Sequence, residues 1–244
     1  MKVVATIEAR MTSSRLPGKP MMLVAGKTML EHLVTRLKRA SSIDQIVLAT
    51  TVNSADDVLD ELAGSLDIAV FRGDEQNVLS RVIGAAGSLE ADVIVEITGD
   101  CPLIDPEIVD QVIRIYKANQ ADYVSNVVVR SYADGMDVQV FSLETLHRSA
   151  EVTVDPLDLE HVTLHIRNNP GLFSHIHVLA PPSLHWPELG LTLDEKADFD
   201  LLENIIEHFD SSKPEFSCSD VLDYLRLNPD LVGLNAAVVR KDNT

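Results

Sequence analysis

The chain has 244 residues, with 38 acidic and 20 basic side chains and a formal charge of −18 at pH 7. This excess of acid argues against general nucleic-acid binding, which needs a cationic surface, but it leaves room for a small anionic ligand at a local cationic site. Aromatic residues make up only 5% and aliphatic residues dominate, as suits parallel strands buried on both faces.

Cysteine usage and hydropathy bear on the compartment. Cys101 and Cys218 are too few and too far apart for a disulfide framework or a zinc knuckle, which suits a reducing environment. Residues 1–9 enter an apolar run without the pattern of a signal peptide, and no apolar run approaches the length of a membrane span. We therefore expect a cytoplasmic protein with neither a membrane nor a nucleic acid as partner.

Strand and helix patterns alternate through the first half of the chain. Apolar runs predict strands at 3–7, 46–50, 68–71 and 93–98, and helical spacing predicts helices at 29–37, 58–66, 77–89 and 106–116. This alternation with short links predicts an α/β fold with a mostly parallel sheet covered on both faces.

The pattern changes past residue 122. Further strands are predicted at 123–129, 136–141, 174–179 and 190–193, and further helices at 142–149, 156–168 and 197–208. We expect one domain over residues 1–210 with an inserted lobe at about 125–185. Residues 211–244 form a helical extension, to which the sequence assigns no function.

The loop after the first strand has the most distinctive chemistry. Arg10, Arg15 and Lys19 lie close together in the sequence, with the Ser13 hydroxyl and a Pro17-Gly18 turn among them. Because ligands of open α/β sheets bind at the carboxyl ends of strands, this loop is suited to hold the phosphates of a nucleotide. The alternative is a solvated turn whose cations pair with acidic neighbours.

The loop matches neither common glycine-rich phosphate motif. Gly26-Lys27-Thr28 resembles the end of a Walker loop, but the first glycine of that pattern would fall on Met21. No Gly-x-Gly-x-x-Gly follows the first strand, so a dinucleotide fold has no support. Side chains must then supply as much of the phosphate binding as the backbone does.

Two aspartates follow predicted strands. Asp100 comes after the strand at 93–98, and Asp194 after the one at 190–193. If these strands are parallel neighbours, both carboxylates emerge at one edge of the sheet. Magnesium takes one or two protein carboxylates with phosphate oxygens and water, so we predict Asp100 and Asp194 as its ligands. Each could instead cap the helix that follows it, although Asp105 is placed to cap the first of these helices.

Several segments together resemble a known family. They are Arg10-Met11-x-Ser13-x-Arg15-Leu16-Pro17-Gly18-Lys19, Gly99-Asp100-Cys101-Pro102-Leu103-Ile104, Asp122-Tyr123-Val124-Ser125-Asn126, Asp134-Gly135-Met136-Asp137-Val138, Glu160-His161-Val162-Thr163, Ile166-Arg167-Asn168-Asn169-Pro170 and Leu191-Thr192-Leu193-Asp194-Glu195. They are similar to the spore coat polysaccharide biosynthesis protein F family, which belongs to the cytidylyltransferases related to CMP-sialic acid and CMP-Kdo synthetases. The likeness is collinear from residue 2 to about residue 208.

The resemblance implies a glycosyltransferase-A-like (Rossmann-like) fold of the nucleotide-diphospho-sugar transferase type. It implies transfer of CMP from CTP to a sialic-, pseudaminic-, legionaminic- or Kdo-like sugar acid, with release of pyrophosphate, for surface polysaccharide. It also implies that Arg10 and Lys19 hold the triphosphate and that Mg²⁺, or Mn²⁺, binds Asp100 and Asp194. The expected nucleotide contacts are Ala9, Arg10, Ser13, Arg15, Lys19, Arg81, Thr98 and Asp100, of which Arg10, Lys19 and Asp100 are the expected catalytic residues.

The inserted lobe is expected to bind the acceptor. Asp134 and Asp137 are suited to sugar hydroxyls, and His161 and Arg167 to a carboxylate, since arginine pairs well with planar anions. His165 lies four residues after His161, but no glutamate follows His161, so the zinc-protease pattern fails and His165 is expected to be structural. The Kdo enzymes have Gly-Asp-Glu-Pro where this chain has Gly-Asp-Cys-Pro, which leaves the sugar open.

Two alternatives stay open at this stage. One is a nucleotidyltransferase or glycosyltransferase that uses another nucleotide, and the other is a non-catalytic nucleotide-binding subunit. Retention of Arg10, Lys19, Asp100 and Asp194 together favours an enzyme. The resemblance further implies a homodimer formed through the lobe.

Overall fold

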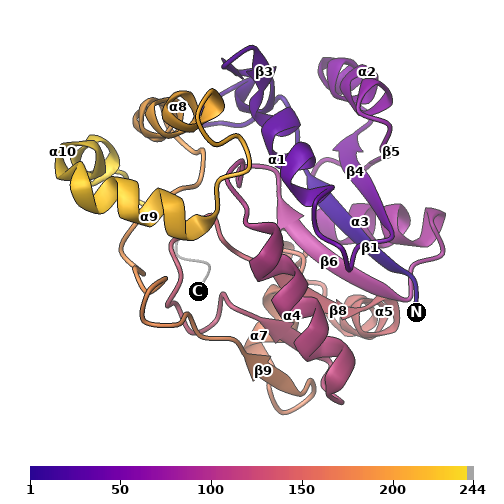
Figure 1. Cartoon of the computed structure of the whole chain (residues 1–244). Coiled ribbons are helices and arrows are strands. Elements are labelled where there is room, and N and C mark those ends of the chain that lie inside the picture. The colour runs from indigo at the N-terminus through magenta and orange to yellow at the C-terminus, as the bar shows by residue number, and fades with distance from the viewer. Residues whose placement is uncertain (241–244) are drawn as a thin grey trace.

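The structure is a computed structural model that describes residues 1–240. Its centre is a mixed sheet of seven strands with helices on both sides (Figure 1). In spatial order the strands are β5 (Ala69–Gly73), β4 (Gln45–Thr51), β1 (Val3–Glu8), β6 (Val93–Thr98), β8 (Gln139–Ser142), β7 (Tyr123–Ser125) and β9 (His175–His177). A separate antiparallel pair consists of β2 (Leu23–Val24) and β3 (Lys27–Thr28).

The direction of the strands brings the loops after β1 and β6 to one edge. Strands β5, β4, β1 and β6 are mutually parallel, whereas β8 runs antiparallel to both β6 and β7. The last residue of β1, Glu8, lies in register with Thr98, the last residue of β6. The cationic loop and Asp100 therefore leave the sheet side by side, at its carboxyl edge.

The helices begin and end close to the predicted positions. They are α1 (Met29–Leu37), α2 (Asp57–Ser65), α3 (Val78–Ser88), α4 (Pro106–Ala118), α5 (Leu143–Val152), α6 (Pro156–Glu160), α7 (Leu164–Asn168), α8 (Lys196–Asp210), α9 (Cys218–Leu227) and α10 (Pro229–Val232). Short 3-10 turns are η1 (Lys19–Met21), η2 (Ser54–Asp56) and η3 (Gly233–Asn235). The alternating first half and the mostly parallel sheet are thus confirmed.

Each face of the sheet buries its own apolar cluster. One cluster joins the sheet to α1, α2, α4, α8 and α9, and the other joins it to α3, α5 and α7. On β1, Val3 and Ile7 belong to the first cluster and Val4 to the second. Because side chains alternate along a strand, Glu8 points to the same face as Val4, the face covered by α3.

Local capping explains where several helices begin. Asp105 accepts a hydrogen bond from Glu107 N at 2.8 Å and precedes Pro106 at the start of α4. Ser142 caps α5 in the same way, because its hydroxyl oxygen accepts a hydrogen bond from Thr145 N at 2.9 Å. Each cap satisfies a backbone N–H that has no partner within its own helix.

The predicted strand at 190–193 is wrong. The segment makes only an isolated bridge between Asp134 and Gly190. Its amides instead pair with two separate partners, since Leu191 N donates to Asp134 O at 2.7 Å and Leu193 N donates to Asp100 O at 2.8 Å. A short run of buried residues of this kind is shared by strands and by extended loops, and pairing with two different segments prevents a ladder.

Other predicted elements are shortened or divided. The predicted helix at 156–168 is two helices, α6 and α7, separated at residues 161–163. The predicted strand at 123–129 ends at Ser125, because the Asn126 side chain takes over the pairing: it accepts from Val138 N at 2.7 Å and donates to Met136 O at 2.6 Å. The division into a domain at 1–210, a lobe and a helical extension stays a prediction.

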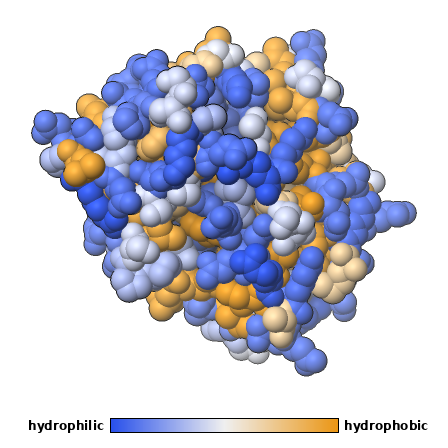
Figure 2. Space-filling view, in the orientation of Figure 1, coloured by the Kyte–Doolittle hydropathy of each residue, from blue (hydrophilic) through white to orange (hydrophobic). Residues whose placement is uncertain are grey.

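Within residues 1–240, no helix combines the length and the apolar character needed to cross a bilayer. The face in Figure 2 is largely hydrophilic, with apolar patches interspersed.

Candidate active site

Four charged side chains from three distant parts of the chain meet at the carboxyl edge of the sheet. Lys19 Nζ lies 3.1 Å from Asp100 Oδ2 and 3.0 Å from Asp194 Oδ1, and it donates to Leu193 O at 2.7 Å. Arg15 Nη2 lies 2.9 Å from Asp194 Oδ1. We call these four residues (Arg15, Lys19, Asp100 and Asp194) the Lys19 cluster.

The backbone brings the two aspartates together without a shared strand ladder. Asp100 follows β6, and the hydrogen bond from Leu193 N to Asp100 O holds the segment before Asp194 against it. Neither aspartate is a helix cap. Asp105 caps α4, and α8 begins after Glu195, whose side chain forms a capping box with Asp198. The capping alternatives for Asp100 and Asp194 are therefore wrong, and both carboxylates face Lys19.

The cluster holds Asp100 and Lys19 in their charged forms. Burial would raise the pKa of Asp100, but the charge of Lys19 and hydrogen bonds hold that pKa below its usual value. Burial would likewise lower the pKa of Lys19, and the two aspartates raise it above the usual value instead. Asp100 and Lys19 thus form a mutually stabilised ion pair, as expected for opposite charges in a partly buried site.

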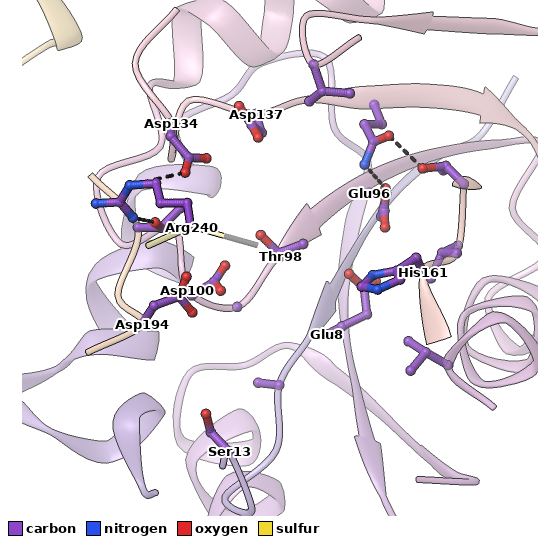
Figure 3. Close-up of a pocket in the computed structure, with 18 of the residues that line it drawn as sticks. Glu8, Ser13, Glu96, Thr98, Asp100, Asp134, Asp137, His161, Asp194 and Arg240 are labelled. Atoms are coloured by element: carbon purple, nitrogen blue, oxygen red, sulfur yellow. Dashed lines mark hydrogen bonds and ion pairs between the residues drawn. The ribbon is translucent and has the colours of Figure 1, made fainter. Parts of the chain in front are cut away.

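A cavity of about 490 Å³ opens at this edge. Figure 3 shows Asp100, Asp194, Asp134 and Arg240 on one side of it and Glu8 with His161 on the other. All the residues predicted for the site line it: Ala9, Arg10, Ser13, Arg15, Lys19, Arg81, Thr98, Asp100, Asp134, Asp137, His161, Arg167 and Asp194. The fold thus brings the predicted nucleotide, acceptor and metal residues to one cavity, and their separate roles stay predictions.

Arg10 lies apart from the Lys19 cluster. Its Nη1 is 3.4 Å from Glu75 Oε1, and Glu75 also accepts from Thr12 Oγ1 at 2.6 Å and from Asn53 Nδ2 at 2.7 Å. The two hydrogen bonds hold the pKa of Glu75 below its usual value. The sequence analysis did not find Glu75, because it lies in a turn that no motif covers. The contact uses Nη1 of Arg10, and the guanidinium has further N–H donors for a phosphate.

The predicted acceptor residues Asp134 and Asp137 share one cation. Arg130 Nη1 lies beside Asp137 Oδ1 and 3.7 Å from Asp134 Oδ1. Burial, followed by the neighbouring charge of Asp137, raises the pKa of Asp134 to about 6, and burial also raises that of Asp137. Sequence reasoning missed Arg130, because it lies in an irregular stretch between β7 and β8.

The wall on the α3 side of the cavity contains two buried glutamates that sequence reasoning missed, Glu8 and Glu96. Glu8 and Glu96 lie on adjacent strands, and burial raises both of their pKa values, that of Glu96 to about 7. Glu96 accepts a hydrogen bond from Gln139 Nε2. Arg81 is held by Asp74 O at 2.7 Å and faces Glu8. Charged residues inside otherwise apolar strands were the available signal for Glu8 and Glu96.

The two helical histidines separate in space. His161, which follows α6, lines the cavity, and so does Arg167 of α7. His165 is not among the lining residues, and its Nδ1 lies 3.2 Å from Asp158 Oδ2. This placement agrees with the structural role expected for His165. Cys101 is also buried, and burial raises the pKa of its thiol well above the usual value, as suits a packed residue.

The Lys19 cluster fits a divalent cation that the protein shares with a ligand. Asp100 and Asp194 place one carboxylate oxygen each within hydrogen-bond distance of the same Lys19 nitrogen, so they can share one ion. Among residues 1–240, no three acidic, histidine or cysteine side chains gather closely enough to bind a metal alone. Two carboxylates completed by phosphate oxygens and water match the preference of Mg²⁺.

A cationic loop after the first strand and two carboxylates beside it, at the carboxyl edge of an open α/β sheet, are suited to bind a nucleotide. The model of the cytidylyltransferase family matches residues 4–226, so the chain belongs to this family. The predicted class of enzyme, a CTP-dependent nucleotidyltransferase, is thereby confirmed.

Individual relatives agree with this assignment. The chain is 30% identical over 233 residues to the spore coat polysaccharide biosynthesis protein SpsF of Bacillus subtilis, which covers 93% of this chain and 95% of that protein. It is 38% identical over 114 residues to the 3-deoxy-manno-octulosonate cytidylyltransferase of Pelobacter propionicus, covering 47% of this chain and 44% of that protein. The family predicted from the sequence is confirmed.

The fold has a solved counterpart. The structure of a cytidylyltransferase from Leptospira borgpetersenii matches with a TM-score of 0.90 and 32% sequence identity, over 95% of this chain and 97% of that chain. The predicted fold, of the nucleotide-diphospho-sugar transferase type, is confirmed.

The buried Glu96 predicts a pH-dependent cost to stability. Its pKa of about 7 exceeds the ordinary value of 4.5, so the unfolded chain releases this proton first as pH rises, and the folded state loses stability between about pH 4.5 and 7. Glu96→Gln keeps an acceptor for Gln139 and removes the charge. We expect the variant to gain about 2 kcal/mol of unfolding free energy over the wild type at pH 8 and little at pH 4.5, measured by urea denaturation. An equal difference at both pH values would contradict the prediction.

Proposed function

We propose that the protein transfers CMP from CTP to a sugar acid and releases pyrophosphate, in the biosynthesis of a surface polysaccharide or glycan. The observation that carries the proposal is the contact of Lys19 Nζ with both Asp100 and Asp194. It supports a site where cations for a triphosphate and carboxylates for a divalent ion lie together. Membership of the cytidylyltransferase family indicates CTP as the nucleotide. The cavity of about 490 Å³ lies within the size range of small-ligand sites.

The cations would bind the departing phosphates. Lys19 and Arg15 are paired with the two aspartates. A triphosphate beside the loop offers both cations oxygen partners of higher charge, which frees the Asp100 and Asp194 carboxylates to hold Mg²⁺, with Mn²⁺ as a substitute. When bound there, the ion supplies neutralisation of phosphate charge and polarisation of the acceptor oxygen. Phosphoryl-type transfer depends mainly on such positioning and electrostatics, because little covalent work falls to the protein.

Other residues of the same cavity would bind the acceptor. Asp134 and Asp137 are placed to accept hydrogen bonds from sugar hydroxyls, and Arg167 to pair with a carboxylate. Arg167 Nε is buried without a hydrogen-bond partner in the described structure. A buried guanidinium nitrogen without a partner is costly, and an anionic group of the acceptor would satisfy it.

A substrate panel tests the proposed reaction. Pyrophosphate release is measured with Mg²⁺, each of CTP, UTP, GTP and ATP, and a range of sialic-, pseudaminic-, legionaminic- and Kdo-type acids. We expect turnover with CTP and at least one of these acids, and none when EDTA removes the divalent ion. Turnover with another nucleotide but not with CTP across the whole panel would contradict the proposal.

Asp100→Asn tests the metal assignment. The amide keeps the shape of the side chain but removes the charge, so kcat should fall at least about 100-fold, as is usual when a preorganised electrostatic group is lost. The melting temperature should change by only a few degrees, because Lys19 keeps Asp194 as a partner. The matched control is Asp57→Asn, which removes an exposed carboxylate paired with Arg72 outside the cavity and should retain activity. Full activity of Asp100→Asn would refute the assignment.

We also propose a homodimer formed through the lobe, in the cytoplasm. Within residues 125–185 the exposed apolar side chains include Val128, Val129, Val152, Val154, Leu157, Leu172 and Leu179. Exposed apolar side chains on a lobe are typical of association surfaces when they gather in one patch. Static light scattering should give twice the chain mass of 26.8 kDa. A concentration-independent monomer would contradict the proposal.

A further inference from the structure

One side chain of the cavity comes from a part of the chain that no motif covers. Arg240 lies past residue 226, where the family match ends, and it lines the cavity beside Asp134 (Figure 3). The sequence analysis assigned no function to this segment. Its path back to the active site is therefore a feature that only the fold reveals.

The segment before Arg240 is fixed to the loop that leads to Asp194. Asn235, at the end of η3, is buried with only 5% of its surface exposed. Its Nδ2 donates to Gly190 O at 2.9 Å and to Asp198 Oδ1 at 2.8 Å. A buried amide with two partners of this kind anchors the backbone that delivers Arg240.

The guanidinium of Arg240 is engaged on all sides by protein. Nη2 donates to Asp198 Oδ1 at 2.9 Å, Nη1 donates to Thr192 Oγ1, and Nε lies 3.6 Å from Asp134 Oδ2. Each nitrogen has a protein partner, so the group is suited to hold other residues in place.

Gly190 provides the space for this arrangement. A Cβ at Gly190 would lie 1.7 Å from Arg240 Nη2, and the backbone there is not in the left-handed region. The glycine is thus required by the close approach of the guanidinium and not by an unusual backbone conformation.

Arg240 connects two parts of the proposed site. Asp198 is fully buried, and its other oxygen accepts from the amides of Asp194 and Glu195, at 3.1 and 2.9 Å. On the other side, the backbone of Asp134 already pairs with the segment, since Asp134 N donates to Leu189 O at 2.9 Å. Arg240 adds a side-chain link, because it contacts both the Asp134 carboxylate and the Asp198 carboxylate that supports this segment.

We propose that Arg240 is a positioning residue that holds the Asp134 carboxylate against residues 190–194 and thereby sets the affinity for the acceptor. The inference rests on the proposed function in one respect, because it takes Asp134 as a contact of the acceptor. It assigns a role in substrate selection to a segment outside the matched family region.

Arg240→Gln in the full chain tests the inference. We expect the KM for the acceptor to rise about tenfold, because small displacements of a positioning group weaken binding strongly, while kcat and the affinity for CTP stay near the wild type. The matched control is Arg226→Gln, which removes another arginine of the same extension. Arg226 donates to Ser183 O and pairs with Asp223, and it does not line the cavity. A merely structural role of Arg240 would lower the melting temperature and impair both substrates equally.

Gly190→Ala gives a second test with Arg240 intact. The added methyl must displace the guanidinium, so the acceptor KM should rise to a similar extent. In an Arg240→Ala background the clash is absent, so the same Gly190→Ala change should add no further loss. Full additivity of the two changes would overturn the proposed coupling.

Hydrogen exchange separates this inference from the proposed function. The amide of Leu191 donates to Asp134 O, so it should exchange faster in Arg240→Gln and remain protected in Arg226→Gln. If the wild type turns over no acceptor in the panel, the proposed function fails and exchange at Leu191 alone decides the linkage. If the Arg240→Gln variant keeps the wild-type KM for the acceptor, the inference is wrong. If no acceptor turns over and the Leu191 amide of this variant exchanges as in the wild type, the inference is also wrong.

Discussion

The site depends on one electrostatic constraint, the partly buried ammonium of Lys19 between two carboxylates. Asp100 and Asp194 are far apart in the chain, and bringing two like charges together costs free energy unless a cation lies between them. Lys19 supplies that cation. A divalent ion held by the two carboxylates would supply the same neutralisation when a triphosphate takes Lys19 as its partner. The fold therefore places Lys19, Asp100 and Asp194 where the proposed triphosphate and divalent ion would complete their charge pairing.

The parallel half of the sheet makes this arrangement possible. Register between Glu8 and Thr98 puts the loop after β1 next to the loop after β6. Asp194 arrives by a different route, because the backbone of Leu193 pairs with Asp100 O rather than with a strand. Arg240 is also held at the cavity by contacts from distant segments. Its guanidinium donates to the buried carboxylate of Asp198, which also accepts from the buried amide of Asn235. Lys19 is also held by the backbone of a distant segment, since its Nζ donates to Leu193 O.

Sequence reasoning predicted the parts of the site that follow regular elements. Strand periodicity located the ends of β1 and β6, so the cationic loop and Asp100 could be placed at one edge. It gave the right neighbourhood for Asp194 but for the wrong reason, because residues 190–193 are buried without forming a strand ladder. Glu75 and Arg130 lie in irregular segments, where position depends on tertiary contacts that no local pattern encodes. Arg240 was beyond reach for the same reason.

A complex with CTP and Mn²⁺ tests the central claim most directly, because anomalous scattering locates the metal independently of the rest of the density. The account predicts a single peak bonded to one oxygen each of Asp100 and Asp194, at about 2.2 Å, with phosphate oxygens completing its coordination and Lys19 on the triphosphate. A metal bonded to neither aspartate, or a triphosphate bound away from Lys19, would contradict it.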